Sequence, residues 1–136
     1  MNLKISLLTS CFTFRCLYAQ AFHNIETYDN GNIKYIYYHQ KISNKIKKIK
    51  FEEYFKNGNK RNEGSFKNNK KSGIWKQWNE EGVKISEGNY TNGYRDGFWV
   101  GWHANGVKQG EVTWKDGKEN GLWIIWHQNG KKMREV

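Results

Sequence analysis

The sequence predicts an all-β protein, an elongated single-layer antiparallel sheet of stacked β-hairpins. The first reason is a 24-residue repeat from residue 54 onward, marked by Gly58, Gly82, Gly106 and Gly130. The second is that turn residues recur once per repeat, each time ahead of strand-forming residues. The third is composition, since 16% of residues are aromatic although only 37% are hydrophobic, which suits a thin sheet covered by rings. A fixed period of this kind indicates units that bury their apolar surface only by stacking on neighbours.

Each repeat is expected to contain two short strands and two turns. Three full copies and a truncated fourth divide the chain into residues 54–77, 78–101, 102–125 and 126–136. In the second copy we expect a strand over residues 84–91, a loop rich in Gly and Asp over 92–97, and an aromatic strand over 98–103. Strands of about five or six residues are typical, so this arrangement fills the period.

Residues 22–53 are interpreted as a degenerate N-terminal copy of the same unit. A turn signal at residues 28–31 precedes a β-prone run at 33–38. About three extra residues separate this turn from the next one, and residues 41–50, within the stretch 39–50, are the expected place of insertion. Strand and helix both remain open there, because three isoleucines have helix-like spacing: Ile42, Ile46 and Ile49.

The repeats share the pattern NG-x-K-x-x-E-G-x-Y-x-x-G-x-x-x-G-x-W-x-x-W. Residues 105–108 show its opening, and residues 87–90 and 97–102 show its body. On this pattern, which recurs over about 80 residues, the chain resembles the MORN-repeat variant family of bacterial proteins. The resemblance implies an extended sheet of stacked hairpins, and family members are described as antitoxins or simply as repeat proteins.

Two positions depart from the shared pattern. Val112 stands where the first two copies have Gly64 and Gly88, and Asn69 stands where later copies have glycine. We expect Val112 to disturb the local packing of the third hairpin without removing the hairpin.

Residues 1–21 are predicted to be a secretory signal peptide. The segment has Lys4 near its start, then an apolar run, then small residues typical of a cleavage site. A lipoprotein signal with lipidation at Cys11 is one alternative, and absence of export is another, because Arg15 interrupts the apolar run. We therefore expect a protein exported to the periplasm, the cell envelope or the medium, and a cytoplasmic protein if the segment is not a signal.

The net charge of +10 is concentrated in one part of the chain. Residues 41–76 hold twelve basic and three acidic side chains, whereas residues 77–136 hold eight of each. The lysines can bind an anionic lipid surface, where each contributes about 1 kcal/mol, or they can protect an exposed edge strand from pairing. The candidates for contact with an anionic surface are Lys45, Lys47, Lys48, Lys50, Lys70 and Lys71.

Two tryptophan rows follow the 24-residue step. The first row comprises Trp75, Trp99 and Trp123. The second lies three residues further on, and this odd spacing along a strand places it on the opposite face. One row is expected to cover Gly64 and Gly88. The rings either pack across strands in place of a core or form a platform for sugar rings or a partner's apolar side chains. The candidates for partner binding are Trp78, Trp102 and Trp126.

The remaining polar residues predict no catalytic, cofactor-binding or metal-binding site. Lysine precedes glutamate by three residues in each repeat, and we interpret these residues as cross-strand ion pairs on a solvated face. Phosphate-loop, dinucleotide-binding and metalloprotease motifs are absent from the sequence, and a thin sheet offers no deep pocket.

We therefore expect a non-enzymatic module for protein–protein interaction in the cell envelope. Its partner is an unknown protein. The alternatives are binding of a basic patch to anionic membrane lipid, and the antitoxin-like binding of a toxin that the family resemblance implies. Nucleic acid is not expected as a partner, because export would remove the usual target.

Overall fold

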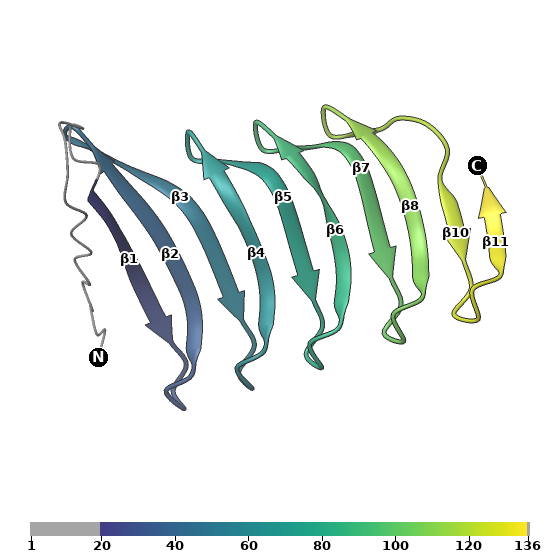
Figure 1. Ribbon diagram of the computed structural model, residues 1–136, viewed down its shortest axis with the longest axis horizontal. Coiled ribbons are helices and arrows are strands. Elements are labelled where there is room, and N and C mark those ends of the chain that lie inside the picture. Colours follow the sequence, from purple (N-terminus) through teal and green to yellow (C-terminus); the bar gives the residue numbers. More distant parts are fainter. Residues whose placement is uncertain (1–19, 136) are drawn as a thin grey trace, which may run out of the picture.

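The computed structural model describes residues 20–135 as one antiparallel sheet (Figure 1). The strands are β1 (Gln20–Thr27), β2 (Ile33–Ile42), β3 (Lys45–Tyr54), β4 (Lys60–Lys67), β5 (Lys70–Trp78), β6 (Lys84–Thr91), β7 (Tyr94–Trp102), β8 (Lys108–Lys115), β9 (Lys118–Glu119), β10 (Ile124–Trp126) and β11 (Lys132–Glu135).

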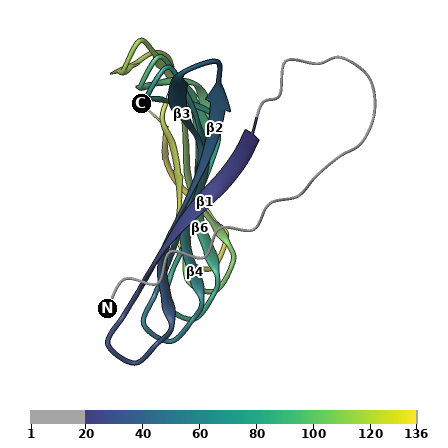
Figure 2. The same cartoon turned by 90° about the vertical axis from the view of Figure 1, so that its left-hand side faces the viewer.

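Each strand pairs with the strands next to it in sequence, except that β9 pairs only with β8, and β8 pairs also with β10. The hairpins follow one another along the long axis of the molecule, and Figure 2 shows the sheet from its end as a single twisted layer. The predicted single-layer sheet of stacked hairpins is thus confirmed. Within residues 20–135, no helix has the length and apolarity required to cross a membrane.

Two kinds of turn alternate along the sheet. At the lower edge in Figure 1, four-residue turns such as Asn79–Gly82 close with a hydrogen bond of 3.0 Å from the Gly82 N–H to the Asn79 carbonyl. At the upper edge the turns contain two residues, and Asn92 and Gly93 there have φ of 54° and 90°. Positive φ at both positions is typical of the hairpin turn whose twist matches the strands.

The two-residue turn corrects the expected loop over residues 92–97. The strand β7 begins at Tyr94, four residues earlier than predicted, because Asn92 and Gly93 alone reverse the chain. In the preceding repeat Asn69 takes the place of glycine with φ of 61°. Asparagine tolerates this left-handed conformation, so its departure from the repeat pattern leaves the turn intact.

Residues 39–50, which the sequence left open between strand and helix, form strands. They complete β2 and begin β3, which have 10 residues each and meet at a turn with Ser43 at φ of 53°. The extra residues therefore lengthen one hairpin. At its tip, Ile42 and Ile46 are 45% and 60% exposed.

The two faces of the sheet differ in kind. We call the side that carries Phe51, Trp75 and Trp99 the ladder face, because these residues lie at successive steps of the repeat. We call the opposite side the ion-pair face; it carries Glu52 and Trp78, among other residues. Trp75 and Trp99 lie on the opposite face from Trp78 and Trp102, as the odd spacing predicts.

The core of the protein is the row of rings on the ladder face. Trp75 and Trp99 are only 5% and 6% exposed. Each indole lies flat on a glycine, since a Cβ added to Gly64 or Gly88 would fall 2.2 Å or 2.1 Å from the ring. The Trp75 Nε1–H also donates a hydrogen bond of 3.1 Å to the carbonyl of Ser65. The expected covering of the two glycines by one tryptophan row is confirmed.

The third copy departs from this packing at Val112. The valine occupies the position of the two glycines, pairs with Trp99 and is itself buried. The next ring, Trp123, is 40% exposed and lies outside a strand. A side chain at Val112 leaves no room for an indole on the backbone, and β9 and β10 are correspondingly short. The ring ladder therefore ends at Trp99, although a hairpin is present.

Alanine at Gly64 or Gly88 is expected to destabilise the sheet. The new methyl group would overlap an indole ring, and overpacking of this kind costs about 1–3 kcal/mol. Guanidinium unfolding of each variant measures the loss, with Gly101→Ala as the matched control. At Gly101 an added Cβ would meet its nearest neighbours at 3.7 Å. Equal stability of Gly88→Ala and Gly101→Ala would show that the ring–glycine contact does not hold the fold.

Candidate functional site

A lysine and a glutamate pair in every complete repeat on the ion-pair face. The Lys60–Glu63, Lys84–Glu87 and Lys108–Glu111 pairs are each 2.7 Å long, and Lys132 pairs with Glu135 in the last copy.

These pairs lie within one strand, so the cross-strand arrangement predicted for them is wrong, although Lys60 and Glu63 also form ion pairs across strands. A β-bulge explains the geometry of the second pair. Trp78 pairs with Lys84 and Gln77 pairs with Ser86, which leaves Ile85 as an extra residue. The bulge turns Lys84 to the same face as Glu87, although their spacing in a regular strand would place them on opposite faces. Exposed pairs of this kind contribute only about 0–1 kcal/mol each.

The predicted partner-binding tryptophans lie beside these lysines. The Lys84 ammonium is 4.4 Å from the ring centroid of Trp102, and Lys108 is 5.0 Å from that of Trp126. Lys60 lies 5.9 Å from the ring of Trp78. All three rings are half-buried. The structure thus places them on one face at successive steps, each with a cation at its side.

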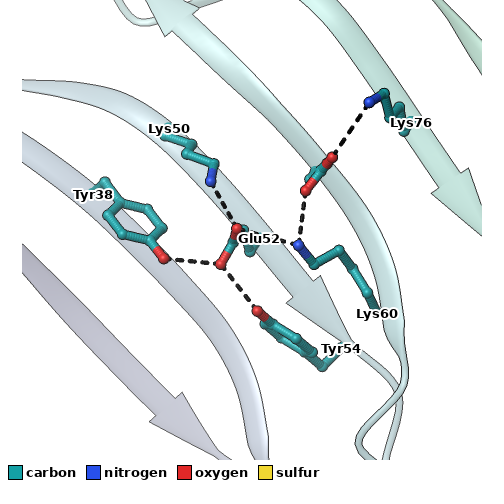
Figure 3. Close-up of polar contacts among 7 residues, drawn as sticks. Tyr38, Lys50, Glu52, Tyr54, Lys60 and Lys76 are labelled. Carbon is teal, nitrogen blue, oxygen red and sulfur yellow. Dashed lines mark hydrogen bonds and ion pairs between the residues drawn. The ribbon is translucent and has the colours of Figure 1, made fainter.

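A buried carboxylate, Glu52, lies on β3 in the N-terminal part of this face (Figure 3). The residue is 6% exposed. Its Oε2 accepts hydrogen bonds of 2.9 Å from the hydroxyls of Tyr38 and Tyr54. Its Oε1 accepts one of 2.8 Å from Lys50 and a longer one of 3.3 Å from Lys60. The Glu52 cluster, defined as these five residues, joins β2, β3 and β4.

The cluster continues into the row of ion pairs. Lys60 bridges Glu52 to Glu63, whose other carboxylate oxygen lies 3.9 Å from Lys76. Figure 3 shows this chain of charges crossing from β3 to β5. Residues 54–77 are thus linked to the preceding copy by a polar contact on this face and by stacked rings on the other.

The cluster holds Glu52 ionised. Burial raises the pKa of the Glu52 carboxyl, but hydrogen bonds from Lys50, Tyr38 and Tyr54 and the charge of Lys60 outweigh it, and the pKa falls to about 2. Burial and the hydrogen bond to Glu52 raise the pKa of Tyr38 to about 12. Neither group titrates near neutral pH, where a general acid or base would have to act. The chemistry of the cluster therefore fits a structural role.

Two features of this face were missed from the sequence. Glu52 occupies the position that Lys76, Val100 and Ile124 occupy in later copies, and this break in the pattern could have identified it. The second feature is a row of exposed apolar side chains at the repeat step, which we call the apolar stripe. Its members are 50%, 55% and 61% exposed: Ile74 on β5 and Phe98 on β7, which face away from Trp75 and Trp99, and Leu122, which follows at the same step just before β10.

The lysines predicted to contact an anionic surface lie in several places. Lys45 and Lys47 are exposed near the tip of the β2–β3 hairpin, and Lys70 is exposed at the start of β5. Lys50 is bound to Glu52 on the ion-pair face. On the ladder face, Lys48 lies over the rings of Tyr37 and Phe66, and Lys71 lies over those of Trp75 and Tyr90. The six lysines thus do not form one patch, and their binding to an anionic surface stays a prediction.

A shallow hollow is present on the ladder face. It opens between the buried rings of Trp75 and Trp99, and it is also lined by Lys71, Gln77, Tyr90 and Arg95. Within residues 20–135, no three His, Cys, Asp or Glu side chains are grouped closely enough to hold a metal ion.

Replacement of Glu52 by glutamine is expected to change how stability depends on pH. Because the folded-state pKa is depressed from 4.5 to about 2, ionised Glu52 stabilises the fold above pH 4.5, and this contribution is lost as the pH falls toward 2. The shift corresponds to about 3 kcal/mol. Urea unfolding from pH 7 to pH 2 should therefore show a gap between wild type and Glu52→Gln that narrows with acidification.

The control is Glu87→Gln, which removes an ion-paired carboxylate that is more exposed than Glu52. This variant should stay within about 1 kcal/mol of wild type at every pH. A gap for Glu52→Gln that does not change with pH would contradict the depressed pKa.

Comparison with known proteins gives one family match. The family model for the MORN repeat variant matches residues 47–68 and 71–92, two consecutive stretches 24 residues apart. The first match covers most of β3 and all of β4, and the second covers most of β5 and all of β6, so each match is one hairpin. No curated protein and no solved structure is significantly similar to the chain. The chain therefore carries MORN repeats of the variant type, at residues 47–68 and 71–92.

Proposed function

We propose that this protein is a non-enzymatic repeat module of the cell envelope that binds a protein partner along its ion-pair face. The apolar stripe carries the proposal. Ile74, Phe98 and Leu122 are each at least half exposed, and they recur once per repeat. Exposed apolar side chains that gather in this way mark sites of interaction. A repeat module that binds proteins or membrane lipid also fits the family match.

The side chains around the stripe support a protein partner. Along β7, Phe98, Val100 and Trp102 alternate and share one face. The half-buried ring of Trp102 is flanked by the charged Lys84. An aromatic anchor with charged residues at its rim is typical of protein interfaces. The corresponding positions on β3 are Lys50, Glu52 and Tyr54, which are engaged in the Glu52 cluster. The proposed surface therefore lies in the later copies.

The proposed location rests on the sequence of residues 1–21. Residues 1–19, including Cys11, lie outside the described part of the chain, and Gln20 and Ala21 open β1. Edman sequencing and the intact mass of the protein recovered from its host would give the mature N-terminus. A start at Phe22 would support ordinary cleavage, a lipidated Cys11 would support a lipoprotein, and an intact N-terminus would contradict export.

Loss of the apolar stripe, or of Trp78 and Trp102, is expected to weaken partner binding strongly. The immobilised wild-type protein would first be used to capture and identify the partner. Affinity for the purified partner would then be measured by calorimetry for wild type, for Trp78→Ala/Trp102→Ala and for Ile74→Ser/Phe98→Ser/Leu122→Ser. Both variants should lose more than about 100-fold in affinity, since interface anchors contribute about 2 kcal/mol or more each.

Tyr94→Ser is the control for this experiment, because Tyr94 is 59% exposed and lies outside the stripe. Its affinity should equal that of wild type. If both the double tryptophan variant and the triple stripe variant kept wild-type affinity, and circular dichroism showed a folded sheet, the ion-pair face would not be the partner-binding surface.

A second candidate function, binding to anionic membrane lipid, is favoured by the tip of the β2–β3 hairpin. Ile42 and Ile46 are exposed there, and Lys41, Lys45 and Lys47 flank them in sequence. Apolar side chains can enter the boundary of the acyl chains while lysines contact anionic headgroups. This arrangement restricts the proposed lipid contact to one end of the molecule.

Sedimentation with vesicles tests the lipid candidate. We expect binding to phosphatidylglycerol vesicles at low salt, weaker binding at physiological salt, and none to phosphatidylcholine vesicles. Lys45→Gln/Lys47→Gln should abolish binding, and Ile42→Ser/Ile46→Ser should weaken it at both salt concentrations. Absence of binding to anionic vesicles at low salt would exclude this candidate.

A further inference from the structure

Cations and aromatic rings alternate from strand to strand on the ladder face. Lys71 lies 5.0 Å from the ring centroid of Tyr90, which is on the next strand, and Arg95 lies 4.9 Å from that of Trp114. Lys48 lies 5.0 Å from the ring of Phe66. These contacts form one row from β3 to β8, which we call the alternating row: Lys48, Phe66, Lys71, Tyr90, Arg95 and Trp114.

The row follows the repeat. Phe66, Tyr90 and Trp114 are 24 residues apart, as are Lys71 and Arg95. Register supports the same arrangement, since Phe66 pairs with Lys71 and Tyr90 pairs with Arg95 across neighbouring strands. The six side chains are half-buried, so each presents part of its surface to solvent.

The cations of the row lack a carboxylate partner within the described residues. Lys48, Lys71 and Arg95 form none of the ion pairs found in residues 20–135. On the opposite face, in contrast, lysines are neutralised by glutamates at every step. The carboxylates of β4 to β8 are all paired with other lysines: Glu63, Glu87, Asp96 and Glu111. The ladder face therefore carries uncompensated positive charge beside aromatic surface.

The hollow described above lies at the centre of the row. Lys71 and Arg95 both line it, with Tyr90 between them and the rings of Trp75 and Trp99 at its sides. It is shallow and open, which suits a ligand that crosses the face and excludes one that must be enclosed.

The spacing of the row indicates the kind of ligand. Equivalent positions are two strands apart, which is about 9.5 Å, close to the length of two linked sugar rings. Carboxylates or sulfates bind the cations by charge-assisted hydrogen bonds, and the C–H groups of sugar rings pack on the negative faces of aromatic rings.

We propose that the alternating row binds a linear acidic polysaccharide with one carboxylate or sulfate for every two sugars, laid across the strands of the ladder face. The cations hold the acidic groups, and Phe66, Tyr90 and Trp114 contact the sugars between them. This site is separate from the proposed protein-binding surface, because the two occupy opposite faces of the sheet.

Calorimetric titration of the full chain with heparin and hyaluronan, and with neutral dextran, tests the proposal. We expect both acidic polymers to bind, dextran not to bind, and affinity to fall with added salt. Lys71→Gln/Arg95→Gln should lose more than about tenfold in affinity, because it removes two of the cations that hold the acidic groups by charge-assisted hydrogen bonds. Lys71→Arg should retain binding, and Tyr90→Ser should weaken it with an unchanged salt dependence.

The matched control is Lys76→Gln/Lys84→Gln, which removes two positive charges from the opposite face. Its affinity for heparin should stay within about twofold of wild type, because salt screens the charges of the ion-pair face from a ligand bound on the ladder face. Equal losses in the two double variants would overturn the proposal in favour of a general charge effect. Binding of phosphatidylglycerol vesicles or oligothymidylate, but of neither polysaccharide, would also overturn it. Circular dichroism of each variant identifies any loss of affinity that comes from unfolding.

Discussion

The contact between an indole ring and a bare glycine backbone is the interaction on which this sheet depends. A single layer has no second layer to cover it, so its apolar surface must be buried within the layer itself. Trp75 and Trp99 achieve this by lying flat on Gly64 and Gly88, with less than a tenth of each side chain exposed. Each indole N–H also donates a hydrogen bond to a backbone carbonyl of the neighbouring strand. Burial of the two rings therefore leaves neither indole N–H without a partner.

Because the ladder face supplies the packing, the ion-pair face can vary along the array without loss of the fold. One position shows this variation clearly: it holds a buried Glu52 on β3, Lys76 on β5, Val100 on β7 and Ile124 on β10. Its chemistry thus changes from a hydrogen-bonded carboxylate to aliphatic side chains over three steps of an otherwise constant geometry. A repeat scaffold of this kind separates what holds the sheet together from what a partner would contact.

The sequence predicted the features that the period controls and missed those that depend on local backbone geometry. The repeat alone located the strand at residues 84–91 and the glycine-covering rings, because identical spacing places identical side chains together. It could not show that Asn92 and Gly93 form a complete turn, so the start of β7 was placed too late. The bulge at Ile85 is equally invisible in the sequence, and it reverses which face Lys84 occupies. The Glu52 cluster escaped notice because it lies mostly ahead of the clear repeats, and no spacing in the sequence shows that Tyr38 and Lys60 approach the same carboxylate.

Val112 has a consequence for how the molecule unfolds. In a linear array, cooperativity passes only between nearest neighbours. A valine that displaces the ring of Trp123 weakens one of these couplings, at the junction of β8 with β10. The hairpins before this junction share the continuous ladder and should behave as one cooperative block, whereas β10 and β11 form a terminal unit that opens at lower free energy. A single branched side chain thus divides the array into a tightly coupled part and a loosely coupled end.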